Sequence, residues 1–133
     1  MLQRFSLRTA GRSQLINITG QVRETVRQSG VRDGLATVYC PHTTAGITIN
    51  EGADPDVAGD FLRYLDNLFP WEHPLYRHSE GNSAAHLKAG IAGAAQVIPV
   101  ADGDLVLGTW QTVFFCEFDG PRERTFLVKV IEG

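Results

Sequence analysis

Hydrophobic and polar residues alternate at both ends of this chain, over residues 2–7 and residues 125–132. Strict alternation is the pattern of a β-strand with one buried face. Runs rich in β-branched and aromatic residues predict further strands, because such residues fit a pleated sheet. These runs cover residues 14–18, 34–40, 45–50, 96–100, 104–107 and 112–118. The pattern therefore predicts about eight strands, with one hairpin joining the first two and another joining 96–100 to 104–107.

Three stretches between the strands have the spacing or the end signals of helices. Residues 19–29 carry an apolar stripe at intervals of four, as a helix on a sheet does. A second helix begins at Asp54-Pro55, an N-cap acid followed by proline in the first turn, and ends before Pro70. Residues 84–92 form the third predicted helix, which a glycine ends.

The length of 133 residues fits one domain, residues 1–133, and the hydrophobic content of 43% is ample for a core. Strands and helices in this order predict an α+β fold. We expect a mainly antiparallel two-layer sandwich or barrel-like core, with about three helices gathered on one side.

Charge and apolar content exclude two classes of partner. The formal net charge is −3 and no run of Lys or Arg is present, which argues against a nucleic-acid binder. No apolar run is long enough to span a bilayer, so no membrane partner is expected. Cys40 and Cys116 lie in apolar strand-like runs and are interpreted as buried free thiols. These features predict a cytoplasmic protein.

The densest group of reactive side chains lies just before the third helix. His78 and Glu80 are in the loop, Asn82 and Ser83 are good N-cap residues, and His86 falls in the first helical turn. The two imidazoles converge only if the glycine after Glu80 lets the loop turn back. A helix start also offers free N–H groups to an anion.

A second polar group flanks the strand 45–50. His42 and Thr43 precede it and Glu51 follows it, and Asp56 and Asp60 lie four apart on the next helix. Like charges at that spacing cost a few tenths of a kcal/mol, which a nearby cation would offset. Ordinary turn chemistry and a solvated acidic helix start are the alternative interpretation.

Two further motifs lie between the last strands. Trp110 and Gln111 follow a glycine, and the alternative to a substrate contact is a β-bulge with a core tryptophan. Glu117 and Arg122 flank a Gly-Pro turn. Arg122 has the fork geometry that binds phosphate or carboxylate, with Glu117 to orient it; a plain turn is the alternative.

Three of the four histidines, His42, His78 and His86, each lie near polar residues. This set favours a divalent metal, which we expect to be zinc with an open coordination position. No phosphate-binding loop, dinucleotide fingerprint or nucleophile elbow is present. A metal-dependent enzyme, a phosphate-ester hydrolase and a non-catalytic protein that binds a metal or effector therefore all remain open.

Together these motifs resemble the YjbQ family, often labelled secondary thiamine-phosphate synthase, over almost the whole chain. The residues that carry the resemblance are His42-Thr43-Thr44-Ala45, Ile49-Asn50-Glu51, Asp54-Pro55-Asp56-Val57, Asp60, His78, Glu80-Gly81-Asn82, Ala85-His86-Leu87, Pro99, Gly103, Leu105, Leu107-Gly108-Thr109-Trp110-Gln111, Glu117 and Asp119-Gly120-Pro121-Arg122.

The resemblance implies a compact homotrimer with a site near the subunit contacts and a zinc-like metal. It also implies weak condensation of a pyrimidine diphosphate with a thiazole phosphate, releasing pyrophosphate. Arg122, Arg124 and the helix start at Ser83 would meet the phosphates. Asp56 and Glu51 would hold a metal or shield a developing positive charge.

Overall fold

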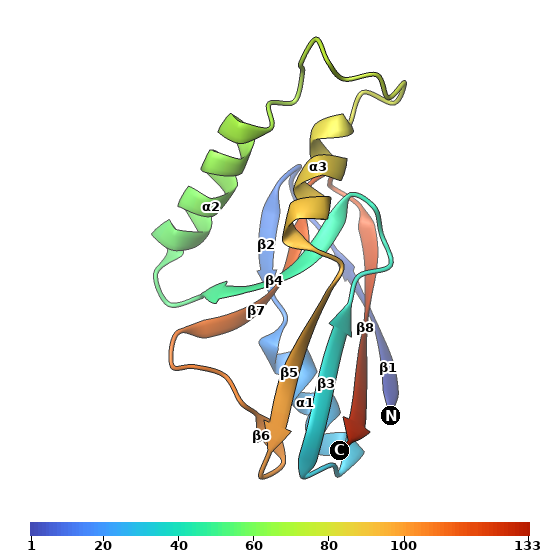
Figure 1. The fold of residues 1–133 in the computed structure, drawn as a ribbon, viewed down its shortest axis with the longest axis vertical. Helices are drawn as coiled ribbons and strands as arrows, with labels where there is room; N and C mark the ends of the chain where they lie inside the picture. The colour runs from blue at the N-terminus through green and yellow to red at the C-terminus, as the bar shows by residue number, and fades with distance from the viewer.

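The computed structural model describes residues 1–133 and contains eight strands and three helices (Figure 1). In chain order the elements are β1 (Leu2–Arg8), β2 (Gln14–Asn17), α1 (Thr19–Ser29), β3 (Asp33–Tyr39), β4 (Ala45–Glu51), α2 (Pro55–Leu68), α3 (Ser83–Ala92), β5 (Ala95–Ala101), β6 (Asp104–Leu105), β7 (Gln111–Glu117) and β8 (Glu123–Glu132). The α+β fold with a mainly antiparallel β core is therefore confirmed.

The strands form two antiparallel sheets, ordered β1-β8-β3-β5-β6 and β2-β7-β4. The predicted hairpin of the first two strands is wrong, because β1 pairs with β8 and β2 pairs with β7. The connection between β1 and β2 crosses from one sheet to the other, and Thr9 N–H in it donates to Arg122 O at 2.9 Å. The β5–β6 hairpin is confirmed, with Asp102 and Gly103 both at positive φ, as a tight hairpin turn requires.

The main core lies between the two sheets and includes the apolar stripe of α1. Val22 and Val26 of that stripe are almost fully buried, and Phe115 of β7 faces Phe126 of β8 with ring centroids 6.2 Å apart. Full burial of a side chain of this kind stabilises the fold by roughly 1.5–3 kcal/mol. The interval between apolar residues therefore predicts correctly which face of α1 is buried.

The helices are not gathered on one side, which corrects the prediction. Helix α1 packs into the core between the sheets, whereas α2 and α3 cover the outer face of the three-stranded sheet (Figure 1). The reason is that β7 is apolar on both faces: Phe115 points into the main core and Cys116 into a second cluster with Leu65 and Ala85. Both faces of that sheet must therefore be covered.

A close backbone approach fixes α3 on the sheet. Ile47 N–H donates to Gly93 O at 3.0 Å, and a Cβ on Gly46 would lie 2.7 Å from the same oxygen. Only glycine permits that approach, so Gly46 determines how closely the end of α3 meets β4. The start of α2 is as predicted, since Asp54 Oδ1 accepts from Asp56 N–H at 2.9 Å. None of the three helices combines the length and apolar character needed to cross a bilayer.

Candidate functional site

A cavity of about 300 Å³ without any apolar lining residue lies where the β3–β4 loop, the start of α3 and the β7–β8 turn meet. We call it the polar cavity. Its lining residues are Thr43, Thr44, His78, Glu80, Asn82, His86, Asp119, Arg122 and Arg124. Seven side chains that the motifs or the family resemblance proposed as site residues are therefore brought together here, although they come from three separate stretches of the chain.

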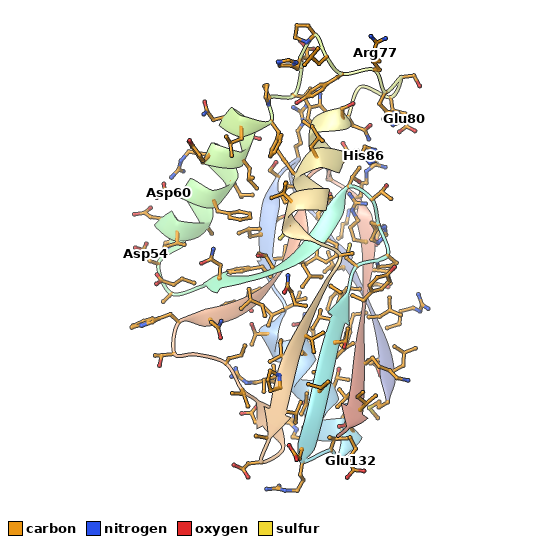
Figure 2. The ribbon with its side chains drawn as sticks, in the orientation of Figure 1. Asp54, Asp60, Arg77, Glu80, His86 and Glu132 are labelled. Atoms are coloured by element: carbon orange, nitrogen blue, oxygen red, sulfur yellow. The ribbon has the colours of Figure 1, made fainter.

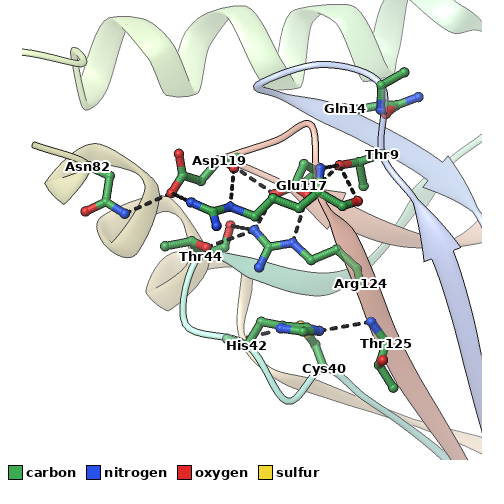
Figure 3. A network of polar contacts seen from close by, with 12 residues as sticks. Thr9, Gln14, Cys40, His42, Thr44, Asn82, Glu117, Asp119, Arg124 and Thr125 are labelled. Atoms are coloured by element: carbon green, nitrogen blue, oxygen red, sulfur yellow. Dashed lines mark hydrogen bonds and ion pairs between the residues drawn. The ribbon is translucent and has the colours of Figure 1, made fainter. Parts of the chain in front are cut away.

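A buried ion pair lies at this cavity, with Arg124 in its lining and Glu117 behind it. Glu117 at the end of β7 is fully buried, and Arg124 near the start of β8 is only 5% exposed. Arg124 Nε donates to Glu117 Oε1 at 2.8 Å, and its Nη2 donates to Glu117 Oε2 and to Thr44 Oγ1 (Figure 3). Nη1 of Arg124 has no partner in the chain. A guanidinium fixed on one side by a carboxylate presents its remaining N–H groups to a ligand.

The surroundings of Glu117 hold it ionised. Burial by itself would raise the pKa of this carboxyl, but it accepts hydrogen bonds from Arg124, Asp119 N–H and Thr9 Oγ1 and lies beside the Arg124 charge. These contacts outweigh burial, and the pKa of Glu117 falls below its ordinary value. Glu117 is not among the residues that line the cavity, so it positions Arg124 from behind.

A second ion pair lies within the β7–β8 turn, and Asn82 connects it to the start of α3. Arg122 Nη2 donates to Asp119 Oδ2 at 3.0 Å, and Asn82 Nδ2 donates to the same oxygen at 2.8 Å. Asn82 occupies the N-cap position of α3, but its side chain makes no capping hydrogen bond. A capping role was predicted for Asn82, and its contact with Asp119 was not. Asp119 belongs to one of the motifs that carry the family resemblance, and it directly precedes a Gly-Pro turn.

His78 and His86 meet as predicted. Their ring centroids are 5.1 Å apart in an edge-to-face arrangement. Gly81 has φ +76°, so it does let the loop turn back. His78 Nε2 lies 4.0 Å from Glu80 Oε1, a weak contact between partly exposed groups. Figure 2 shows His86 on α3 with Glu80 in the loop beyond the helix start.

His42, the third of these histidines, does not line the polar cavity. Its Nε2 accepts a hydrogen bond from Thr125 N–H at 2.9 Å, so the proton of the neutral ring is on Nδ1. Burial lowers the pKa of His42, and the positive charge of Arg124 lowers it further. His42 lines a second cavity of about 350 Å³, which shares Thr43 and His86 with the polar cavity.

The chain does not gather three His, Cys, Asp or Glu side chains in a geometry that could hold a metal ion. Two of the predicted ligands, His78 and His86, are neighbours, but the Nε2 lone pair of His42 is already used by Thr125 N–H. The three-histidine zinc centre stays a prediction, and it requires His42 to give up this hydrogen bond.

Five proposed residues lie in another part of the molecule. Glu51 and Gln111 are opposite each other in the β4–β7 pairing, and Trp110, the residue before Gln111, is 63% exposed. Asp60 forms an exposed ion pair with Arg63 at 2.6 Å. Asp56 shares the start of α2, which Figure 2 shows on the far side of α3 from Glu80. Ser83 begins α3 but lines neither cavity. None of these six residues lines either cavity.

Known proteins match almost the whole chain in sequence. The family model "UPF0047 protein YjbQ-like" matches residues 3–133. The UPF0047 protein YugU of Bacillus subtilis is 53% identical over 131 residues, covering 98% of this chain and 99% of that protein. A UPF0047 protein of Methanocaldococcus jannaschii is 48% identical, covering 98% of this chain and 94% of its own length.

Solved structures show the same fold. A YjbQ/UPF0047 protein from Clostridium acetobutylicum superimposes with a TM-score of 0.95 at 54% identity, covering 97% of this chain and 99% of that one. A YjbQ-like protein of unknown function from Sulfolobus solfataricus gives a TM-score of 0.96 at 34% identity, covering 100% and 97%. Sequence match, full-length coverage and superposition agree, and the chain belongs to the YjbQ-like UPF0047 family.

Proposed function

We propose that this chain is an enzyme that binds the phosphate or diphosphate group of a small-molecule substrate in the polar cavity. The observation that carries this proposal is Arg124, whose buried guanidinium is fixed by Glu117 and has its Nη1 free at the cavity. A planar fork with one edge anchored is the arrangement that suits phosphate oxygens. Because the guanidinium is already ordered, little side-chain entropy is lost when the anion binds.

The neighbouring groups support an anion rather than a cation. Both acids nearest Arg124 are already neutralised: Glu117 by Arg124, and Asp119 by Arg122 and Asn82. At the start of α3, the N–H groups of Ala85 and His86 bond to Asn82 O, whereas those of the two residues before them have no acceptor. Free N–H groups at a helix start attract negative charge.

The reaction that fits best transfers a group with loss of pyrophosphate. The family resemblance suggests condensation of a pyrimidine diphosphate with a thiazole phosphate, in the manner of a thiamine-phosphate synthase. In that reaction Arg124 and Arg122 would stabilise charge as it builds on the leaving pyrophosphate. The thiazole nitrogen would attack with its lone pair and has no proton to lose, so His86, which lines both cavities, would donate a proton to the leaving pyrophosphate.

Phosphate-ester hydrolysis is the second candidate. The observation that favours it is the His78–His86 pair beside the anion-binding groups, because an imidazole can take a proton from an attacking water. The two reactions separate in one assay. A hydrolase releases phosphate from a simple ester without an acceptor, whereas the transferase releases pyrophosphate only when the thiazole phosphate is present.

The zinc prediction is kept apart from this mechanism. A divalent ion, when bound, would supply extra positive charge to a leaving phosphate. The side chains of one subunit do not supply three converging ligands, so no step here passes through a metal. Metal analysis of protein purified without chelator tests the prediction, with His86→Ala as the comparison.

We also propose a cytoplasmic setting, because the two cysteines are free and buried rather than joined in a disulfide. A homotrimer is a further part of the proposal. Glu51, Asp60 and Trp110 do not line the polar cavity of their own chain. A neighbouring copy is the simplest way to bring them there. The outer face of the five-stranded sheet offers exposed apolar side chains for such contacts: Leu35, Tyr39, Val97 and Ile131. Sedimentation velocity measures the assembly state directly.

The experiment for the proposed function is a turnover assay on wild type and Arg122→Ala. Arg122 is half exposed, so its removal leaves the fold intact, and we expect turnover to fall while sedimentation is unchanged. If wild type releases neither pyrophosphate nor phosphate, the chain is instead a non-catalytic trimer. If release is the same in both proteins, the polar cavity around Arg122 is not the reaction site.

A further inference from the structure

The loop between α2 and α3 borders a small cavity whose walls are mostly aromatic. The cavity has a volume of about 210 Å³, and its lining residues are Trp71, Glu72, His73, Tyr76, His78 and Gly81. Four of these six residues carry an aromatic ring, counting the two imidazoles, one is a carboxylate, and neither Arg nor Lys is among them. We call it the aromatic cavity.

Hydrogen bonds to the loop backbone hold two of the rings in place. Tyr76 Oη donates to Pro70 O at 2.7 Å, and His73 Nδ1 accepts from Leu75 N–H at 3.1 Å. The rings of His73 and Tyr76 are inclined at 44° with their centroids 5.5 Å apart, so they form two walls at an angle. A site whose walls are already ordered loses little side-chain entropy when a ligand binds.

The third wall, Trp71, already contacts one cation. It packs against the second hydrophobic cluster, and Arg12 Cζ lies 4.0 Å from the centroid of its ring, within the range of a cation–π interaction. Arg12 does not line the aromatic cavity, but it lines a different cavity with Trp71 and Asp66. Arg12 therefore orders the indole ring without occupying the aromatic cavity.

The charge of this lining suits a cation. Aromatic faces carry partial negative charge, and Glu72 adds a full one. A primary ammonium is strongly hydrated, and Glu72 is the only carboxylate in the lining to replace that water. A methylated ammonium spreads its charge over methyl groups, which pack against ring faces.

We propose that the aromatic cavity binds the trimethylammonium group of a small soluble molecule. The volume of about 210 Å³ suits a head group of this size. The inference goes beyond the proposed function, which concerns an anion in the polar cavity. The two cavities have only His78 in common among their lining residues.

The two tryptophans of the chain, Trp71 and Trp110, give the test an internal control, because Trp110 does not line the aromatic cavity. Choline titrated into isotope-labelled protein is expected to shift the indole N–H resonance of Trp71 to saturation and to leave that of Trp110 in place. Ethanolamine lacks the three methyl groups, and a neutral alcohol in which carbon replaces the charged nitrogen keeps the shape without the charge. We expect both probes to bind about tenfold more weakly than choline.

Two variants test the charge and the rings separately. Glu72→Gln removes the carboxylate at an exposed position and should weaken choline binding about threefold, while binding of the neutral alcohol is unchanged. Glu132→Gln is the matched control, because Glu132 is exposed, lines no cavity and lies at the end of the molecule opposite to Glu80 (Figure 2). Tyr76→Leu removes one wall and should abolish the saturable shift of Trp71, with circular dichroism to confirm that it folds.

The inference is overturned if choline gives no saturable shift of Trp71 in wild type, or if the neutral alcohol binds as tightly as choline. Glu72→Gln with the choline affinity of wild type would also contradict it, even if Tyr76→Leu fails to fold. Wild type that sediments with phosphatidylcholine vesicles would show a membrane head group as the ligand and contradict the small soluble molecule. Each of these results leaves the proposed phosphate site standing, because pyrophosphate binding is measured separately.

Discussion

Glu117 and Arg124 form an enclosed ion pair between strands of different sheets. Glu117 ends β7 in the three-stranded sheet, and Arg124 lies near the start of β8 in the five-stranded sheet. Thr9 and Thr44, which flank β1 and β4, add hydrogen bonds to the same pair (Figure 3). One polar network therefore both joins the two layers and presents a guanidinium at the cavity.

Removing the carboxylate is expected to be costly. Glu117→Gln leaves the Arg124 charge buried without its partner, and the free energy of unfolding should fall by about 3–5 kcal/mol. Urea unfolding followed by circular dichroism measures this loss. Glu123→Gln is the control, because Glu123 pairs with Arg8 at the exposed surface, where such a pair contributes under about 1 kcal/mol. Similar losses in both variants would contradict the role given to the buried pair.

The lowered pKa of His42 predicts a pH dependence of stability. The folded protein takes up a proton on His42 less readily than the unfolded chain, whose ordinary value is 6.5. Stability should therefore fall as the pH drops below about 6.5, because the unfolded state gains protons first. Unfolding midpoints at pH 7.5 and 5.5 test this, with His42→Gln, which keeps an acceptor for Thr125 N–H, as comparison. A midpoint difference as large in His42→Gln as in wild type would exclude His42 as its source.

The lowered pKa of Glu117 predicts a separate effect in acid. The carboxylate stabilises the fold above its unfolded value of 4.5, and this contribution disappears as the pH falls through the still lower folded value. We expect the added sensitivity to acid below about pH 4.5 to be absent from Glu117→Gln, although that variant is less stable at neutral pH. Acid titration of the near-ultraviolet signal measures it, and parallel curves would argue against an ionised Glu117.

The position of α3 should depend on Gly46. A methyl group there would lie 2.7 Å from Gly93 O, so Gly46→Ala must push the end of α3 away from β4 at a cost of about 1–3 kcal/mol. Because α3 carries His86, pyrophosphate binding should weaken as well. Gly20→Ala has open space around its new Cβ and should be neutral or stabilising. Equal stability of the two variants would contradict this packing.

Local pattern was enough to find the elements of this fold. Asp54-Pro55 marks the start of α2, Val22 and Val26 mark the buried face of α1, and Gly81 marks the loop reversal that joins His78 to His86. Each of these signals acts over a few residues, so it is readable in the sequence.

Strand pairing and contacts between residues far apart in the sequence could not be predicted from local pattern. Turn chemistry around Gly11 suggested a hairpin, but β1 pairs with β8, more than a hundred residues away. Thr9 and Thr44 are ordinary threonines in the sequence, and only the fold places their hydroxyls on the Glu117–Arg124 pair. Glu51 and Asp60 carry suitable chemistry, yet the topology sends them to another face.

The most direct test of the central claim is calorimetric titration of pyrophosphate into wild type, Arg124→Lys and Arg8→Lys. Lysine at 124 keeps a charge for Glu117 but loses the anchored fork, so affinity should fall about tenfold or more. Arg8 is exposed and lines no cavity, so Arg8→Lys should bind as wild type does. Unchanged affinity in Arg124→Lys, or no binding in wild type, would contradict the assignment of the polar cavity as a phosphate site.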